Sequence, residues 1–253
     1  MASAATLPEG LGPVVRRFVR MHPEAYAGGA VALAWLALLG LHAQTSTHPH
    51  GLMAGMDMSV AHSRWWQTAG RELPGWELMV IAMMGLALLP ALGHASVNSF
   101  PWRRKRAMVE VASAYLAVWT VFGFVALAAL QPLRDARAPL AVALVFAALW
   151  ELAPPKRRAL RDCHRVVPLP PRGLGAEVAA FRFGLRQGSA CMRSCWPVML
   201  VMALLPMGQL WWMVGLTALV TSERFLDRPQ HVRRVAAGAM AIAALGVLLA
   251  AFL

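Results

Sequence analysis

Charged side chains are scarce in this sequence. Asp, Glu, Lys and Arg make up 14% of its 253 residues, and only 12 residues are acidic. Soluble domains typically carry about a quarter of their residues charged, so an ordinary soluble domain is excluded. The apolar share of 58% and the mean hydropathy of +0.54 also exclude a disordered chain, because disorder needs low hydrophobicity. A lipid bilayer is the natural solvent for such a chain.

Cysteine is also scarce, and several catalytic motifs are missing. The three cysteines, Cys163, Cys191 and Cys195, cannot form a closed disulfide framework, so they are free thiols, metal ligands or at most one bridge. The sequence lacks a phosphate-binding Gly-rich motif ending in Lys-Ser/Thr, a Gly-x-Ser-x-Gly motif and a His-Glu-x-x-His motif. It has no histidine in the middle of an apolar run, which argues against a bis-imidazole haem. We therefore expect no haem or nucleotide, and we do not favour an enzyme.

Long apolar runs define the expected fold. A helix needs about 20 residues to cross a hydrocarbon core of about 30 Å, and this criterion finds seven candidates. They are residues 25–43, 76–92, 109–130, 138–153, 184–205, 207–223 and 233–253. We read a hairpin at Pro206 and Gly208, although a single long kinked helix there would reduce the count to six. The sequence predicts an all-α, polytopic transmembrane helix bundle.

The basic residues set the expected topology. With the N-terminus in the cytoplasm, 20 of the 24 Lys and Arg residues lie on the inner side, and four lie outside: Arg64, Arg71, Arg134 and Arg137. This asymmetry accounts for the net charge of +12 without a nucleic-acid partner. We expect a cytoplasmic segment (1–24) and one integral domain (25–253) with an outer loop (44–75) and a basic cytoplasmic loop (154–183). The asymmetry therefore predicts an integral membrane protein that crosses the membrane several times.

The first apolar run has a second interpretation. Residues 16–43 have a basic start, an apolar stretch and a small residue before Gln44, as a cleaved signal peptide does. We favour an uncleaved anchor, because the apolar stretch is long for a signal peptide and Leu41-His42-Ala43 is a poor cleavage site.

The outer loop, which we name the His/Met loop, is dense in soft ligands. It contains His48, His50, Met53, Met56 and Met58 within eleven residues. Imidazoles and thioethers favour copper, with Cu(I) preferring sulfur. The alternative is a flexible loop whose methionines pack against the membrane surface.

Two further groups of sulfur-containing residues are spaced so that each group shares one face of a predicted helix. Met79 and Met83 are one turn apart, and Cys191, Cys195 and Met199 repeat every four residues. Buried methionine and cysteine are also ordinary packing residues, so packing remains the alternative for both groups. Cys163 and His164, in the preceding basic loop, are candidates to complete a metal site with the thiols of Cys191 and Cys195.

Several motifs resemble the bacterial family described as predicted metal-binding integral membrane proteins, the domain-of-unknown-function family 2182. The likeness covers roughly residues 53–225. It rests on Met53, Met56 and Met58; Trp76 with Ala82-Met83-Met84; Tyr115-Leu-Ala-Val-Trp119 with Gly123; Pro155-Lys156 with Leu160-Arg-Asp-Cys163; Gly184, Gly188, Cys191, Cys195-Trp196 and Met199; and Trp212-Met213 with Glu223. The resemblance implies a membrane-embedded helical fold and a metal site.

The sequence departs from that family at two thiol positions and at a proline. Ser194 and Ala159 stand where the family commonly has cysteine, and Pro90 comes six residues after Met84, whereas in the family a proline follows the Met-Met pair closely. The loss of two thiolates implies a different metal, a lower affinity or a retired site.

These observations favour a membrane protein that binds a soft metal, most simply copper, and takes part in its handling or delivery. Its partners would be the bilayer and a protein that gives or receives metal. A different hypothesis is a scaffold or accessory subunit of a membrane oxidoreductase, with the cysteines as packing residues. The third is a redox enzyme that uses Cys191 and Cys195 as a dithiol, which helix spacing disfavours.

Overall fold

The computed structural model describes residues 25–47, 65–134, 137–205, 210–226 and 229–252. Every regular element in these residues is a helix, so the predicted all-α bundle is confirmed. The elements are α2 (Ala25–Thr47), α3 (Trp65–Val97), α4 (Arg104–Leu130), the short 3-10 helix η2 (Gln131–Leu133), α5 (Arg137–Leu152), α6 (Pro154–Cys163), α7 (Leu174–Leu204), α8 (Leu210–Phe225) and α9 (Pro229–Phe252).

Each of the seven apolar runs overlaps a helix, but α3 begins at Trp65 and α7 at Leu174, so both helices start inside the loops expected at 44–75 and 154–183. One more helix lies in the expected basic loop. That extra helix is α6, which begins at Pro154 and buries Lys156, Ala159 and Cys163 on one face while exposing its arginines. Helices α7 and α8 are separate, because the backbone of Leu205 is extended and ends α7. The structure therefore has one helix on each side of residues 206–209, which themselves lie outside the described residues.

Not every helix has the length and apolarity that a membrane span needs. In the described residues, α2, α3, α4 and α9 meet both requirements. A fifth span exists if α5 and α6, which are bent by 69° at Ala153, are counted as one. Helix α8 has 16 residues and is about 24 Å long, shorter than a core of about 30 Å. Helix α7 has 31 residues and is long enough to span a membrane, but Arg182, Arg186 and Arg193 lie along it, so it does not meet the requirement for apolarity.

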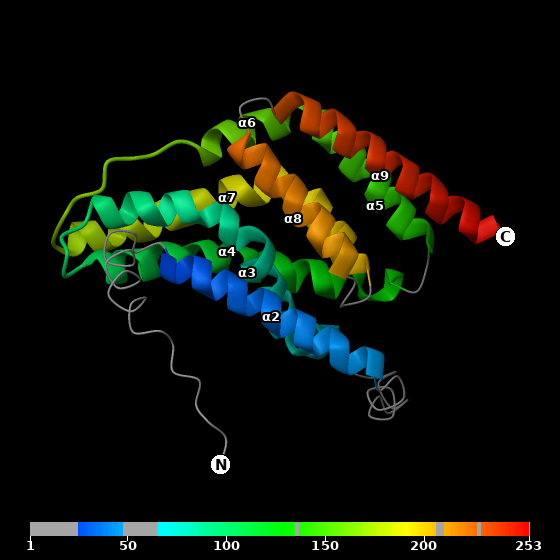
Figure 1. Cartoon of the computed structure of the whole chain (residues 1–253), viewed down its shortest axis with the longest axis horizontal. Helices are drawn as coiled ribbons and strands as arrows, with labels where there is room; N and C mark the ends of the chain where they lie inside the picture. Colours follow the sequence, from blue (N-terminus) through cyan, green and yellow to red (C-terminus); the bar gives the residue numbers. More distant parts are fainter. Residues whose placement is uncertain (1–24, 48–64, 135–136, 206–209, 227–228, 253) are drawn as a thin grey trace, which may run out of the picture.

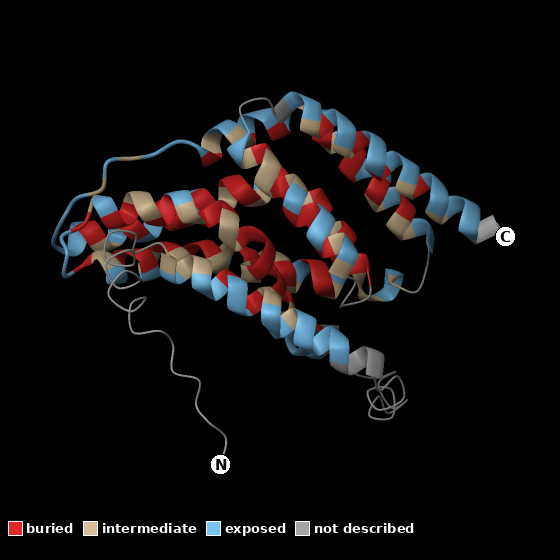
Figure 2. Ribbon diagram, in the orientation of Figure 1, coloured by how far each residue is buried: buried red, intermediate tan, exposed pale blue. Residues whose placement is uncertain are grey.

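Helices α3, α4 and α7 form the centre of the bundle (Figure 1). Helix α4 packs against both α3 and α7, and α2 lies on the outside of α3. Helices α5 and α9 run side by side as a pair beside α7 and α8. Buried residues line the faces that these helices turn toward one another, whereas much of α2 and α9 is exposed (Figure 2).

Two glycines allow α7 to approach α4 closely. A Cβ atom at Gly184 would lie 2.4 Å from the carbonyl oxygen of Val111, and one at Gly188 would lie 3.1 Å from that of Tyr115. Small residues four apart let helix backbones approach, as in membrane helix pairs. This contact fixes the position of α7 next to α4 just before the cysteine pair begins.

Candidate metal site

The two thiols of α7 lie on one face of the helix, enclosed by protein. The Sγ atoms of Cys191 and Cys195 are 3.9 Å apart, as expected for side chains one turn apart. Both residues are buried and both thiols are free, with no disulfide between them. The Cys195 thiol donates to the carbonyl oxygen of Cys191 at 2.9 Å, so its position is fixed.

Helix α4 adds a polar contact to this pair. The hydroxyl of Tyr115 donates to Sγ of Cys191 at 3.0 Å, and Tyr115 is itself buried. The close approach of α4 at Gly188 positions this hydroxyl. A donor aimed at sulfur stabilises the thiolate, which is the form of cysteine that binds metals.

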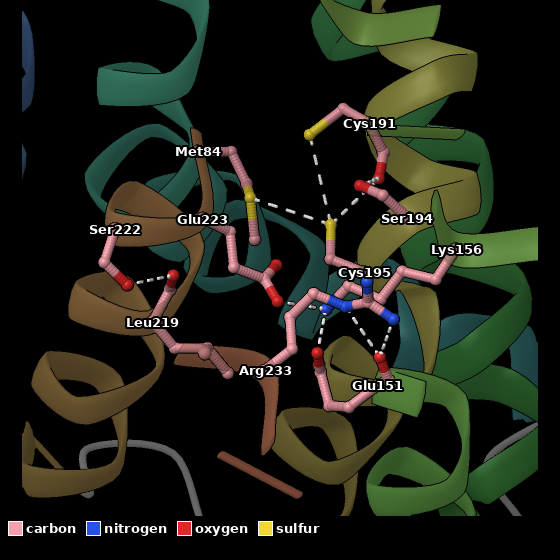
Figure 3. A network of polar contacts seen from close by, with 10 residues as sticks. All are labelled: Met84, Glu151, Lys156, Cys191, Ser194, Cys195, Leu219, Ser222, Glu223 and Arg233. Atoms are coloured by element: carbon pink, nitrogen blue, oxygen red, sulfur yellow. Dashed lines mark hydrogen bonds and ion pairs between the residues drawn. The ribbon is translucent and has the colours of Figure 1, made fainter. Parts of the chain in front are cut away.

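Helix α3 supplies a third sulfur, that of Met84. Its Sδ atom lies 4.0 Å from Sγ of Cys195, and Met84 is fully buried (Figure 3). Sequence reasoning selected Met79 and Met83 on this helix and missed Met84 as a ligand. The available signal was the Ala82-Met83-Met84 stretch, but a single helix does not show which of two adjacent methionines faces a neighbouring helix.

The spacing of the sulfurs fits a soft metal ion. Metal–thiolate bonds are about 2.3 Å long, so three sulfurs around one ion in a plane are about 4 Å apart. The Cys191–Cys195 and Cys195–Met84 separations, 3.9 Å and 4.0 Å, match two edges of such a triangle. Two thiols and a thioether form a donor set that selects Cu(I) over harder ions.

Cys163 lies close to this group, at the end of α6. It is buried, its backbone carbonyl accepts a hydrogen bond from Arg224 at 3.3 Å, and its thiol neighbours Cys191 and Ser194. The Ser194 hydroxyl donates to the carbonyl oxygen of Cys191 at 2.7 Å, so it is a hydrogen-bond donor at the position where a third α7 cysteine would stand. Cys163 is the third thiol of the chain and a neighbour of the pair, although in the described residues the three cysteines are not arranged as a group that could hold a metal.

The structure places the other expected ligands in several different surroundings. Met83 and Met199 are fully buried in the core, and Met79 lines a separate cavity. His164 is exposed, with its ring nitrogens 2.8 Å from the carbonyl oxygen of Leu160 and 3.2 Å from that of Arg224. His48, His50, Met53, Met56 and Met58 of the His/Met loop lie outside the described residues.

A buried cluster of charges lies beside the sulfurs (Figure 3). The ammonium group of Lys156 pairs with the carboxylate of Glu151 and, at 2.8 Å, with that of Glu223. The guanidinium of Arg233 donates to the carbonyl oxygen of Glu151. These four residues come from α5, α6, α8 and α9, and all are buried. The cluster joins α5, α6, α8 and α9 to one another, and Lys156 lies near Cys195 of α7.

Arg224 brings a positive charge close to the thiols. Its guanidinium donates to the carbonyl oxygen of Cys163 at 3.3 Å and interacts with Cys191, Cys163 and Tyr115. A cation at this position favours anionic sulfur and an anionic copper–thiolate complex. Among the residues that the structure describes, no group of three or more His, Cys, Asp and Glu side chains is arranged to hold a metal.

Comparison with known proteins identifies one family. The model of a family described as a copper chaperone, PpoB2, matches residues 73–248. The matched stretch includes Met84, all three cysteines and the buried charge cluster, and it begins after the His/Met cluster of residues 48–58. No curated protein and no solved structure matches the chain.

Proposed function

The chain belongs to the PpoB2 copper chaperone family, and from this membership we propose that it is an integral membrane protein that holds Cu(I) on the α7 thiols and passes it to a protein partner. The single observation that carries the proposal is the group of three buried sulfurs, Cys191, Cys195 and Met84, with separations of 3.9 and 4.0 Å. Cys163 is the candidate for an additional thiolate.

A second group of soft ligands supports transfer toward the His/Met loop. Met79, Met202 and Met213, together with His42, line a cavity of about 190 Å³ between α2, α3, α7 and α8. Met79 and Met84 are five residues apart on α3, which is about 7.5 Å along the helix axis. Thioethers bind Cu(I) without a charge, so they suit short-lived binding during transfer. The His/Met loop would then be the outer end of the route.

Membrane integration is part of the proposal. The four apolar helices α2, α3, α4 and α9 support it, as does the strong bias of Lys and Arg to one side of the expected topology. With the N-terminus in the cytoplasm, α6 and the thiols lie toward the cytoplasmic side and the His/Met loop lies outside. We propose a bacterial inner membrane as the location.

Elemental analysis tests this proposal. The protein is purified in detergent under anaerobic, reducing conditions, loaded with Cu(I) and freed of excess metal, in wild-type form and as the Cys191→Ser/Cys195→Ser variant. We expect near-stoichiometric copper in the wild type and a large loss in the variant. Met192→Leu, on the same helix but outside the sulfur group, is the matched control and should keep its copper. Equal copper in the double variant and the wild type would overturn the proposal.

A further inference from the structure

A cavity with strongly basic walls lies where α6 meets the end of α8 and the start of α9. Its volume is about 570 Å³, within the range of small-molecule sites. Its basic lining residues are Arg157, Arg158, Arg161, His164, Arg224 and Arg233, and the acidic residue in its lining is Glu223.

The positive charge of this cavity is not neutralised by its own walls. Glu223 is already paired with Lys156 at 2.8 Å, and Arg224 and Arg233 donate to backbone carbonyl oxygens rather than to carboxylates. Arg157, Arg158 and Arg161 are exposed, and in the described part of the chain no carboxylate forms an ion pair with them. The cavity therefore attracts anions and repels a free cation.

Arg224 links this cavity to the copper thiols. It lines the cavity, and its guanidinium also donates to the carbonyl oxygen of Cys163 at 3.3 Å and neighbours the thiol of Cys191. An anion held in the cavity would thus lie one side chain away from the sulfur group. The positive charges of the cavity repel a bare Cu⁺ ion. They attract copper that is already bound by thiolates, because that complex is anionic.

We propose that this basic cavity binds Cu(I) as an anionic complex of small thiols and exchanges copper between that complex and Cys191 and Cys195. The inference rests on the proposed function and adds the form in which copper is exchanged. Glutathione is a suitable probe, because it has two carboxylates, one ammonium group and one thiol. Its 2:1 thiolate complex with Cu(I) carries about three net negative charges near neutral pH.

The exchange is balanced without any change of oxidation state. Each protein thiol gives its proton to a departing thiolate as a new Cu–S bond forms and an old one breaks. Two Cys–SH groups and one bis-thiolate Cu(I) complex become one protein-bound Cu(I) with two thiolates and two free small thiols. The Cu(I)S₂ core keeps a charge of −1 throughout, and Arg224 remains beside that charge.

Timed copper transfer into the apo-protein in detergent tests the inference. The variant carries Arg157→Gln, Arg158→Gln and Arg161→Gln. The matched control carries Arg172→Gln, Arg182→Gln and Arg186→Gln, three exposed arginines outside this cavity. Copper is supplied as the anionic Cu(I)–glutathione complex or as the cationic Cu(I)–acetonitrile complex, and protein-bound copper is measured at intervals after rapid gel filtration.

We expect the cavity variant to take copper from glutathione about ten-fold more slowly than the wild type and with a weaker dependence on salt. Its rate from the acetonitrile complex should be unchanged or higher, and the control should match the wild type with both donors. Equal rates from glutathione in the cavity variant and the wild type would overturn the inference while leaving the proposed function intact. A wild type that takes copper from neither donor would contradict the proposed function itself.

Discussion

Sδ of Met84 lies 4.0 Å from Sγ of Cys195, although 111 residues separate them along the chain. This contact joins α3 to α7 through two buried sulfur atoms. Together with Cys191, it makes a donor set from two helices rather than from one motif. Such a site depends on how the helices pack, so it responds both to ligand substitutions and to changes at the helix contacts.

Met84→Leu should weaken Cu(I) binding without abolishing it. The substitution removes a thioether but keeps a side chain of similar volume, so the core should tolerate it. Met83→Leu, at the adjacent position, is the matched control and should bind copper as the wild type does. Competition with a Cu(I)-specific chromogenic chelator measures both affinities. Equal weakening by the two substitutions would mean that Met84 has no special role.

Lys156→Met should strongly destabilise the protein. It leaves the carboxylates of Glu151 and Glu223 buried without their cation, and breaking a buried ion pair in this way costs about 3–5 kcal/mol. Arg157→Met, one residue away and exposed, should have little effect on stability. Thermal unfolding in detergent, followed by circular dichroism, compares the two. A Tm for Lys156→Met equal to that of the wild type would show that the cluster does not hold the helices together.

Gly184→Ala should disturb the contact between α4 and α7. The new Cβ would lie 2.4 Å from a backbone oxygen, which cannot rotate away, so we expect a loss of about 1–3 kcal/mol. Gly175→Ala lies on the same helix with no atom within 4 Å of the new Cβ, and it should be neutral or slightly stabilising. The difference in Tm between the two variants is the measurement. Equal Tm values would contradict close packing at Gly184.

The proposed topology makes a separate prediction. A reporter enzyme that is active only outside the cytoplasm should be active when inserted in the His/Met loop between α2 and α3, at residues 48–64. It should be inactive when fused before residue 25 or inserted between α6 and α7, at residues 164–173. The reverse pattern would place the α6 cavity on the outer side and would exclude cytoplasmic thiols as its ligands.

The helices could be predicted from the sequence, because each depends on a local run of apolar residues. The same holds for the thiol pair, since side chains four residues apart on a helix always share a face. The amphipathic α6 was not predicted, because it is short and its four basic residues resemble a loop. Its stability comes from packing Ala159 and Cys163 against α7, which local sequence does not show.

The third sulfur and the buried charges could not be predicted for a different reason. Met83 and Met84 are adjacent, and local sequence does not show that the packing of α3 against α7 brings Met84 to Cys195. Lys156 and Glu151 stand at the ends of apolar runs, where water would normally solvate them. They are buried because α5, α6, α8 and α9 converge there and pair opposite charges. Both features depend on contacts between residues far apart in the sequence.

X-ray absorption spectroscopy of the Cu(I)-loaded, full-length protein at the copper edge tests the central claim most directly. We expect copper in the +1 state with sulfur neighbours alone at about 2.3 Å. The number of sulfur neighbours should fall, or the copper should be lost, in the Cys191→Ser/Cys195→Ser variant. A first shell of nitrogen or oxygen atoms in the wild type, or an identical sulfur shell in the variant, would contradict copper binding by the α7 thiols.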